Sequence, residues 1–172
     1  MVKNDTIKNK MVIYIDTREK KYLHIEDYFQ KNLINYKFKK LDYGDYSCEV
    51  DGIPLESVVF IERKGSIDEL CNNFCNGRDR FEKEFDESIG VKYLLIEDGS
   101  YEDIRNHNYK SEMNPNALIG SIKSFEVNYG IKTNFISKDF SGDFIYSTLR
   151  AFAKKTIEVK KKKEKNNNYD YN

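Results

Sequence analysis

The stretch from residue 41 to residue 68 constrains the fold more than any other part of the sequence. It contains two runs rich in Val, Ile, Phe and Tyr, Tyr46–Val50 and Leu55–Ile61, which are typical of β-strands. Asp51 and Gly52 lie between these runs and predict a tight turn, because glycine accepts the positive φ that a short hairpin turn requires. We therefore expect a β-hairpin here, with a bulge or a longer loop as the alternative.

Acidic and basic residues lie at both open ends of this hairpin. Gly44-Asp45 precedes the first run, and Glu62-Arg63-Lys64 follows the second. The turn folds Asp45 back toward Glu62. Because alternate residues of a strand share a face, Glu62 and Lys64 should point the same way and Arg63 the opposite way. Carboxylate oxygens suit Mg²⁺ or Mn²⁺, and a lysine can orient a nucleophile or stabilise phosphate charge, so the pattern predicts a metal-dependent phosphodiesterase site.

Three short motifs occur in an order that is found in one known family. They are IDTRE at residues 15–19, GD at 44–45 followed by ERKGSID at 62–68, and NGR at 76–78. These are similar to the V-D-x-R-E, GD…ERKxxxD and N-G-R motifs of the XPF-type structure-selective endonucleases. The resemblance covers roughly residues 11 to 90 and rests on the ordered set, since a lone E-R-K has little specificity.

The fold class that we expect is α/β, with a mixed central sheet flanked by helices. Expected strands cover 11–16, 36–41, 46–50, 55–61, 91–96 and 131–136, and expected helices cover 22–31, 67–75, 78–88, 115–128 and 141 to about 153. Residues 97–108 are expected to be mostly loop, with a short helix as the alternative. The resemblance implies a restriction-endonuclease-like core. We expect one nuclease domain over 11–153, between a flexible N-terminus (1–10) and a flexible tail rich in lysine and asparagine (154–172).

The expected metal ligands are Asp45 and Glu62, with Asp16 as a third because it ends an adjacent strand. The backbone carbonyl of Arg63 is a further candidate ligand. Lys64 is expected to orient the attacking water or to offset charge that develops in the transition state. A protonated lysine suffices for either role.

The resemblance also implies that Arg63 and Glu19 belong to the active site. Arg63 should face away from the metal and pair with a carboxylate, either Glu19 or Asp68. A structural salt bridge and a catalytic role are equally open for Arg63. Asp68 has two interpretations as well, a functional group or a favourable charge in the first turn of a helix.

Three arginines are candidates for DNA contact. Arg18 lies in the first motif, and Arg78 and Arg80 lie at the start of a predicted helix, where backbone N–H groups and guanidinium groups together attract phosphate. For Arg78 the resemblance implies either DNA contact or bracing of the site. The chain departs from the family at this helix. Many relatives carry a glutamine a few residues after the motif arginine, whereas this sequence has Glu82 and Glu84, and either is a candidate for that place.

The overall charge balance gives no sign of a nucleic-acid partner. The chain has 29 Lys+Arg and 29 Asp+Glu. A DNA partner would therefore be held by a local basic patch or through metal ions. The lysine-rich tail is either a solvated end or a basic arm that contacts the phosphate backbone.

We expect the protein to be cytoplasmic, associated with the nucleoid in a bacterium or free in the host cytoplasm for a phage. Residues 1–11 lack the apolar core of a signal peptide, no apolar run is long enough for a membrane span, and three cysteines suggest free thiols. The helix-hairpin-helix modules of eukaryotic and archaeal family members are expected to be absent. Binding to DNA would then depend on a homodimer, on the tail or on a partner protein. By analogy, the homodimer would form through the helix at 115–128.

The expected function is a Mg²⁺- or Mn²⁺-dependent DNA endonuclease that acts on branched, flap or junction DNA in recombination, repair or phage replication. Structure selectivity is implied by the resemblance, whereas the residues themselves predict only phosphodiester hydrolysis. One alternative is an inactive DNA-binding or scaffold subunit, although such subunits usually lose an acidic motif residue and this sequence retains them all. Another is a nuclease fold that acts on RNA or on a small phosphoester.

Overall fold

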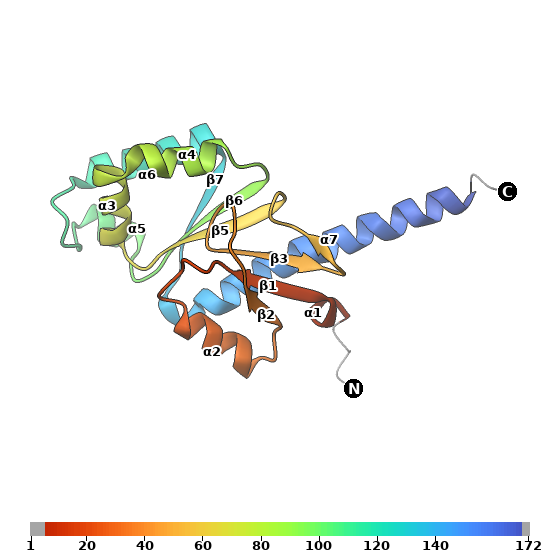
Figure 1. Ribbon diagram of the computed structural model, residues 1–172. Coiled ribbons are helices and arrows are strands. Elements are labelled where there is room, and N and C mark those ends of the chain that lie inside the picture. The colour runs from red at the N-terminus through yellow and green to blue at the C-terminus, as the bar shows by residue number, and fades with distance from the viewer. Residues whose placement is uncertain (1–5, 170–172) are drawn as a thin grey trace.

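The structure is a computed structural model that describes residues 6–169, and its centre is a mixed seven-stranded sheet (Figure 1). The strand order is β2-β1-β3-β5-β6-β7, and β4 pairs with β3 at the side. The β1–β2, β5–β6 and β6–β7 pairs are parallel, whereas β3 is antiparallel to β1, β4 and β5. The strands are β1 (Met11–Ile15), β2 (Tyr36–Phe38), β3 (Tyr46–Val50), β4 (Ile53–Pro54), β5 (Val59–Lys64), β6 (Val91–Ile96) and β7 (Ile131–Phe135).

Helices cover both faces of this sheet. Residues of α2 and α7 belong to one hydrophobic cluster, and residues of α3, α4, α5 and α6 belong to a second cluster (Figure 1). The helices are α1 (Thr6–Lys10), α2 (Leu23–Lys31), α3 (Ile67–Asn76), α4 (Arg78–Asp86), α5 (Tyr101–Arg105), α6 (Pro115–Tyr129) and α7 (Ser141–Tyr169), with a 3-10 turn at Lys138–Phe140. The α/β class with a mixed, helix-flanked sheet is therefore confirmed.

Side-chain alternation along β5 decides where the charged residues at its end point. Val59 and Ile61 are buried in the α2–α7 cluster, whereas Phe60 between them is buried in the α3–α6 cluster. Continuing this alternation places Glu62 on the α3–α6 face of the sheet and Arg63 on the α2–α7 face. One strand thus delivers charged groups to two different layers.

The predicted hairpin forms, but its second strand is shorter than expected. Asp51 and Gly52 both have positive φ (54° and 75°), as in the turns that favour hairpins, and they connect β3 to the short β4. The prediction of one continuous strand over 55–61 was wrong. The backbone N–H groups of Val58 and Val59 both donate to the Leu55 carbonyl, so the chain turns before β5 begins at Val59.

The last helix is longer than the sequence pattern predicted. It was expected to end near residue 153, but α7 continues to Tyr169, because lysine and glutamate are good helix formers even where nothing packs on them. At the other end, residues 6–10 form α1, and residues 1–5 lie outside the described part. The flexibility predicted for both ends stays a prediction. Within residues 6–169 no helix combines the length and apolar character that a membrane span requires.

Candidate active site

The loop that carries Asp45 is fixed between two strands. The Asp45 N–H donates to the Ile61 carbonyl (2.9 Å), and the Asp45 carbonyl accepts from the Asp16 N–H (2.8 Å). The carboxylate of Asp45 in turn accepts the backbone N–H of Arg63 at 2.8 Å. These contacts hold the Asp45 side chain beside the carboxyl end of β5, where Glu62 lies.

Glu62 and Lys64 form a buried ion pair on one face of β5, as strand alternation predicts. The Lys64 Nζ donates to Glu62 Oε1 at 2.6 Å, and the two residues are only 7% and 6% exposed. The same ammonium group lies 4.9 Å from the centre of the Phe81 ring on α4. Lys64 is thus held in one position by a carboxylate and an aromatic face.

The two carboxyl groups carry more negative charge than one lysine can offset. Burial, followed by repulsion from Glu62 and Glu19, raises the pKa of Asp45 well above its ordinary value. Burial also raises the pKa of Glu62 to about 7, because Glu84 adds to the rise and Lys64 only partly opposes it. Such a site favours a bound cation, and oxygen ligands of this kind suit a divalent metal ion.

The described residues contain no group of three or more His, Cys, Asp or Glu side chains arranged to hold a metal ion. Two carboxylates nevertheless fit Mg²⁺, which usually binds through one or two carboxylates and keeps several waters. Asp45 and Glu62 are therefore the residues that could hold a metal here.

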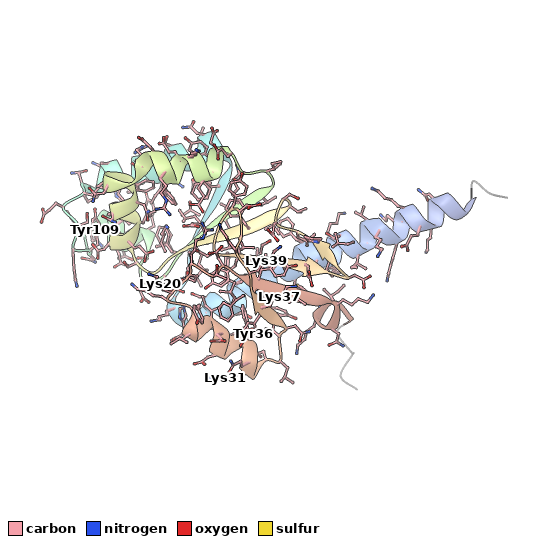
Figure 2. The ribbon with its side chains drawn as sticks, in the orientation of Figure 1. Lys20, Lys31, Tyr36, Lys37, Lys39 and Tyr109 are labelled. Carbon is pink, nitrogen blue, oxygen red and sulfur yellow. The ribbon has the colours of Figure 1, made fainter. Side chains whose placement is uncertain are left out.

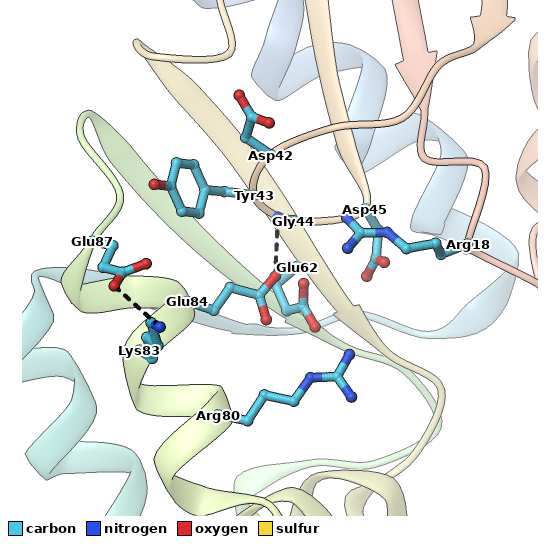
Figure 3. Close-up of a pocket in the computed structure, with 10 residues that line it drawn as sticks. All are labelled: Arg18, Asp42, Tyr43, Gly44, Asp45, Glu62, Arg80, Lys83, Glu84 and Glu87. Atoms are coloured by element: carbon cyan, nitrogen blue, oxygen red, sulfur yellow. Dashed lines mark hydrogen bonds and ion pairs between the residues drawn. The ribbon is translucent and has the colours of Figure 1, made fainter.

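Glu84 is a third acidic residue at this site, and the sequence left it open against Glu82. Its Oε1 accepts the Gly44 N–H at 3.1 Å, and its carboxyl group lies beside that of Glu62 (Figure 3). Glu82 instead accepts from Arg78 Nε at 2.7 Å. Glu84 therefore takes the place beside the active-site carboxylates.

Asp16 does not join the two carboxylates, and the prediction that all three meet was wrong. Arg18, two residues later, donates its backbone N–H (2.7 Å), Nε (2.8 Å) and Nη2 (3.0 Å) to the Asp16 carboxylate, and Leu41 adds its N–H (2.7 Å). Although burial opposes it, these hydrogen bonds lower the pKa of Asp16. Asp16 thus anchors two loops through four donors.

Arg63 is buried on the opposite face of β5 and pairs with two carboxylates. Its Nε and Nη2 each donate to Glu19 at 3.1 Å, which confirms one of the two predicted partners. Its Nη1 donates to Glu97 Oε2 at 2.7 Å, and Glu97 Oε1 lies 2.7 Å from His24 Nε2. Glu97 was missed by sequence reasoning, although it directly follows β6, the parallel neighbour of β5.

Asp68, the alternative partner for Arg63, has a different role. Its Oδ1 accepts the backbone N–H groups of Lys110 (2.8 Å) and Ser111 (2.7 Å). Asp68 therefore fixes the loop that precedes α6.

Two cavities meet at the acidic pair. A cavity of about 380 Å³ is lined by ten residues that include Arg80 and Lys83 (Figure 3), and one of about 420 Å³ is lined by residues that include Lys20 and Lys21. Both cavities are lined by Arg18, Asp45 and Glu62. An extended substrate could therefore pass on both sides of the carboxylates.

The basic side chains that line these cavities differ in whether they already pair with a carboxylate. Arg80 points into the first cavity (Figure 3), and Lys20 lies in the loop after β1 (Figure 2). Neither forms an ion pair with any residue in the range 6–169, so both are free to meet an anion. Arg18 remains 55% exposed at its side chain although it pairs with Asp16.

Arg78, for which DNA contact and bracing of the site were the two predicted roles, lines neither cavity. Its guanidinium lies over the rings of Phe74 and Phe125, 5.9 and 5.6 Å from their centres, and also contacts Ser121. Its pairing with Glu82 completes these contacts. Arg78 therefore braces α3, α4 and α6 in this structure.

Comparisons with known proteins agree with this architecture. The model of the ERCC4 domain family matches residues 15–148. XPF from Aeropyrum pernix is a similar solved structure, with 17% identity, a TM-score of 0.65, and coverage of 87% of this chain and 69% of that chain. XPF from Aeropyrum pernix in complex with DNA gives 18% identity, a TM-score of 0.63, and coverage of 83% and 65%. No protein with a curated description matches.

The structural likeness establishes the fold, which is the restriction-endonuclease-like fold of the XPF nuclease domain. The present chain spans about two thirds of the length of each of those two solved chains. The family match covers the larger part of the sequence and includes Asp45, Glu62 and Lys64. The chain belongs to the ERCC4 domain family.

Proposed function

We propose that this protein is a metal-dependent DNA endonuclease. The observation that carries the proposal is the half-buried Asp45 beside the buried Glu62–Lys64 ion pair, at the point where two cavities that carry both acidic and basic residues meet. Membership of the ERCC4 domain family supports nuclease chemistry, and the similar XPF structure in complex with DNA supports DNA as the substrate class.

The chemistry follows from the charges at the site. Asp45 and Glu62 would hold a Mg²⁺ or Mn²⁺ ion, which when bound supplies an activated water and offsets phosphate charge. Burial alone would lower the pKa of Lys64, but Glu62 stabilises the ammonium form, and the pKa is raised as a result. Lys64 therefore acts as a fixed positive charge that orients the nucleophile or stabilises the transition state. Arg18 and Arg80 would contact the flanking phosphates.

The finer substrate preference is part of the proposal. Branched, flap or junction DNA, and roles in recombination, repair or phage replication, are inferred from the family. Incubating the protein with labelled linear, flap and four-way-junction DNA in Mg²⁺, in Mn²⁺ and in chelator tests both the endonuclease activity and the preference for a DNA structure. Metal-dependent nicking supports the endonuclease. Tight junction binding without nicking supports a scaffold subunit, and cleavage of RNA alone supports the RNA alternative.

The raised pKa of Glu62 predicts an unusual pH dependence of stability. Because the pKa is higher in the folded protein than in the unfolded chain, the folded state binds more protons between about pH 4.5 and 7. Without metal, the free energy of unfolding should therefore decrease as pH rises through this window. Urea unfolding in chelator at pH 5 and pH 8 measures the decrease, and Glu62→Gln should reduce it.

The same site should couple metal binding to stability. At pH 8, millimolar Mn²⁺ should raise the midpoint of thermal unfolding, because the ion binds only the folded site. The increase should disappear in Glu62→Gln. An equal increase in wild type and variant would place metal binding elsewhere.

The lysine-rich end of α7 is proposed to contribute to DNA binding. Residues 158–166 are all exposed, and the helix extends past the sheet (Figure 1). Replacing Lys161, Lys162 and Lys163 by Gln should weaken DNA binding and reduce the slope of log K against log salt by about 3, since each phosphate contact contributes about 0.9. Fluorescence anisotropy across a salt series measures the slope.

The matched control removes the same charge elsewhere. Lys31, Lys110 and Lys138 are also exposed and form no side-chain ion pair in the described part of the chain. Their triple replacement by Gln should change the slope much less. Equal effects of the two triple variants would show that only net charge matters and that α7 makes no contact.

A further inference from the structure

A third cavity adjoins the catalytic one and differs from it in chemistry. Its volume is about 290 Å³, roughly ten times the space of a water molecule in the liquid. It shares Asp42, Tyr43 and Glu87 with the cavity that holds the acidic pair, so the two cavities are direct neighbours. The remaining lining residues are Pro54, Glu56, Ser57 and Ile89.

The lining of this cavity excludes phosphate and favours a neutral group. Its apolar part comes from Tyr43, Pro54 and Ile89, and its charged lining residues are all acidic. Glu56 pairs with Lys39, and Glu87 pairs with Lys83 at 3.5 Å. Asp42 has no partner among the described residues, so its carboxylate is free to accept a hydrogen bond.

The backbone on both sides of Ile89 is held in place. Ile89 is 74% exposed, yet its loop is fixed on both sides. The Ser88 hydroxyl donates to the Phe85 carbonyl at 2.9 Å. Gly90 has a φ of +95° and passes so close to the residue before β5 that a Cβ there would lie 2.6 Å from the Val58 carbonyl oxygen. A large apolar side chain is thus presented to solvent at the mouth of a cavity by rigid backbone.

Tyr43 offers a flat surface to the same space. Its ring packs on Phe60, with ring centres 6.2 Å apart and an interplanar angle of 33°. It lines both the catalytic cavity and the third cavity, and Figure 3 shows it on the side of Asp42 and Glu87, away from Arg18. A planar ligand could therefore lie against Tyr43 while an attached phosphate lies near Asp45.

We infer that this third cavity receives one unpaired nucleobase of the strand whose phosphate lies at Asp45 and Glu62. The inference rests on the proposed function, since it presumes a polynucleotide in the catalytic cavity. Every base has a face that can stack on an aromatic ring. Every unpaired base also offers an N–H group that can donate to the Asp42 carboxylate, an amino group in adenine, cytosine and guanine and the N3–H in thymine. A base that is already unpaired enters at least cost, which would favour substrates with single-stranded nucleotides beside the cut.

The test uses a series of DNA substrates in which a single abasic site is placed at successive positions of the strand that the full-length protein cleaves. Binding is measured by anisotropy in chelator, and cleavage is measured under single-turnover conditions with Mn²⁺. At one position near the cut, loss of the base should weaken binding about five-fold or more, whereas neighbouring positions should change it little. At that position all four bases should bind more tightly than the abasic site.

Two surface variants assign the effect to this cavity. Ile89→Ser and Asp42→Asn should each reduce the penalty of the abasic site, the first by removing an apolar contact and the second by removing the charge that accepts the N–H group of the base. Val127→Ser is the matched control, because Val127 is an apolar residue that is 82% exposed on α6 and does not line this cavity. It should leave the penalty of the abasic site unchanged.

The possible failures can be told apart. If wild-type protein cleaves DNA but no abasic position matters, or if Ile89→Ser and Asp42→Asn behave like Val127→Ser, the cavity does not receive a base. If wild-type protein neither binds nor cleaves any DNA, the proposed function fails and this inference fails with it. A thermal unfolding midpoint within a few degrees of wild type should be confirmed for each variant.

Discussion

Replacing Glu62 by Gln is expected to reduce DNA cleavage by at least about 10³-fold. The amide keeps the size of the side chain but loses the negative charge that would hold the metal and that now pairs with Lys64 at 2.6 Å. Metal-assisted stabilisation of charge in a transition state is worth several kcal/mol, and each 1.36 kcal/mol corresponds to a factor of ten in rate. Asp45→Asn should have a similar effect, because Asp45 supplies the second carboxylate.

Single-turnover cleavage of a labelled junction with saturating protein measures this loss. DNA binding in chelator should be unchanged or tighter in both variants, since a negative charge is removed from the DNA-facing cavity. Glu82→Gln is the matched control, because Glu82 lies on α4 but pairs with Arg78 outside both cavities. If Glu62→Gln cleaves within about ten-fold of wild type, Glu62 is not a metal ligand.

The central part of this site could be predicted from a local rule. Alternation along a strand was enough to place Glu62 and Lys64 on one face and Arg63 on the other. This rule acts over a few residues, so a single sequence contains it. The ordered motifs then indicated the family, which the family match over residues 15–148 confirms.

The errors arose where several partners compete for one charge. Asp16 has a carboxylate at the end of a strand, but Arg18 and the Leu41 N–H occupy it, and that choice depends on how two loops pack. Glu84 and Glu97 reach the site from α4 and from the end of β6, so their roles depend on the arrangement of elements in space. Propensity and spacing carry no information of that kind.

Replacing Arg63 by Ala is expected to lower the free energy of unfolding by about 3–5 kcal/mol. Arg63 is 3% exposed and is the shared partner of Glu19 and Glu97, which are themselves buried. Removing one partner from a buried ion pair leaves charge without compensation, and this penalty is of that size. Urea unfolding at pH 7.5 measures the loss. Arg80→Ala is the control, because Arg80 is exposed and unpaired in the described structure, and it should change stability by no more than about 0.5 kcal/mol.

The pH dependence of the Arg63→Ala defect tests its electrostatic origin. In wild type, burial opposes ionisation of Glu19, but the hydrogen bond from Arg63 prevails and lowers its pKa. This contribution is present above the unfolded pKa of a glutamate and is lost as pH falls through the lower folded value. In the variant, Glu19 stays buried without its partner, so its folded pKa should rise and protonation should relieve the penalty. The stability difference between wild type and Arg63→Ala should therefore shrink as pH falls from 7.5 to about 4. A difference that stays constant over this range would mean that Arg63 stabilises the fold through packing of its side chain and not through its charge.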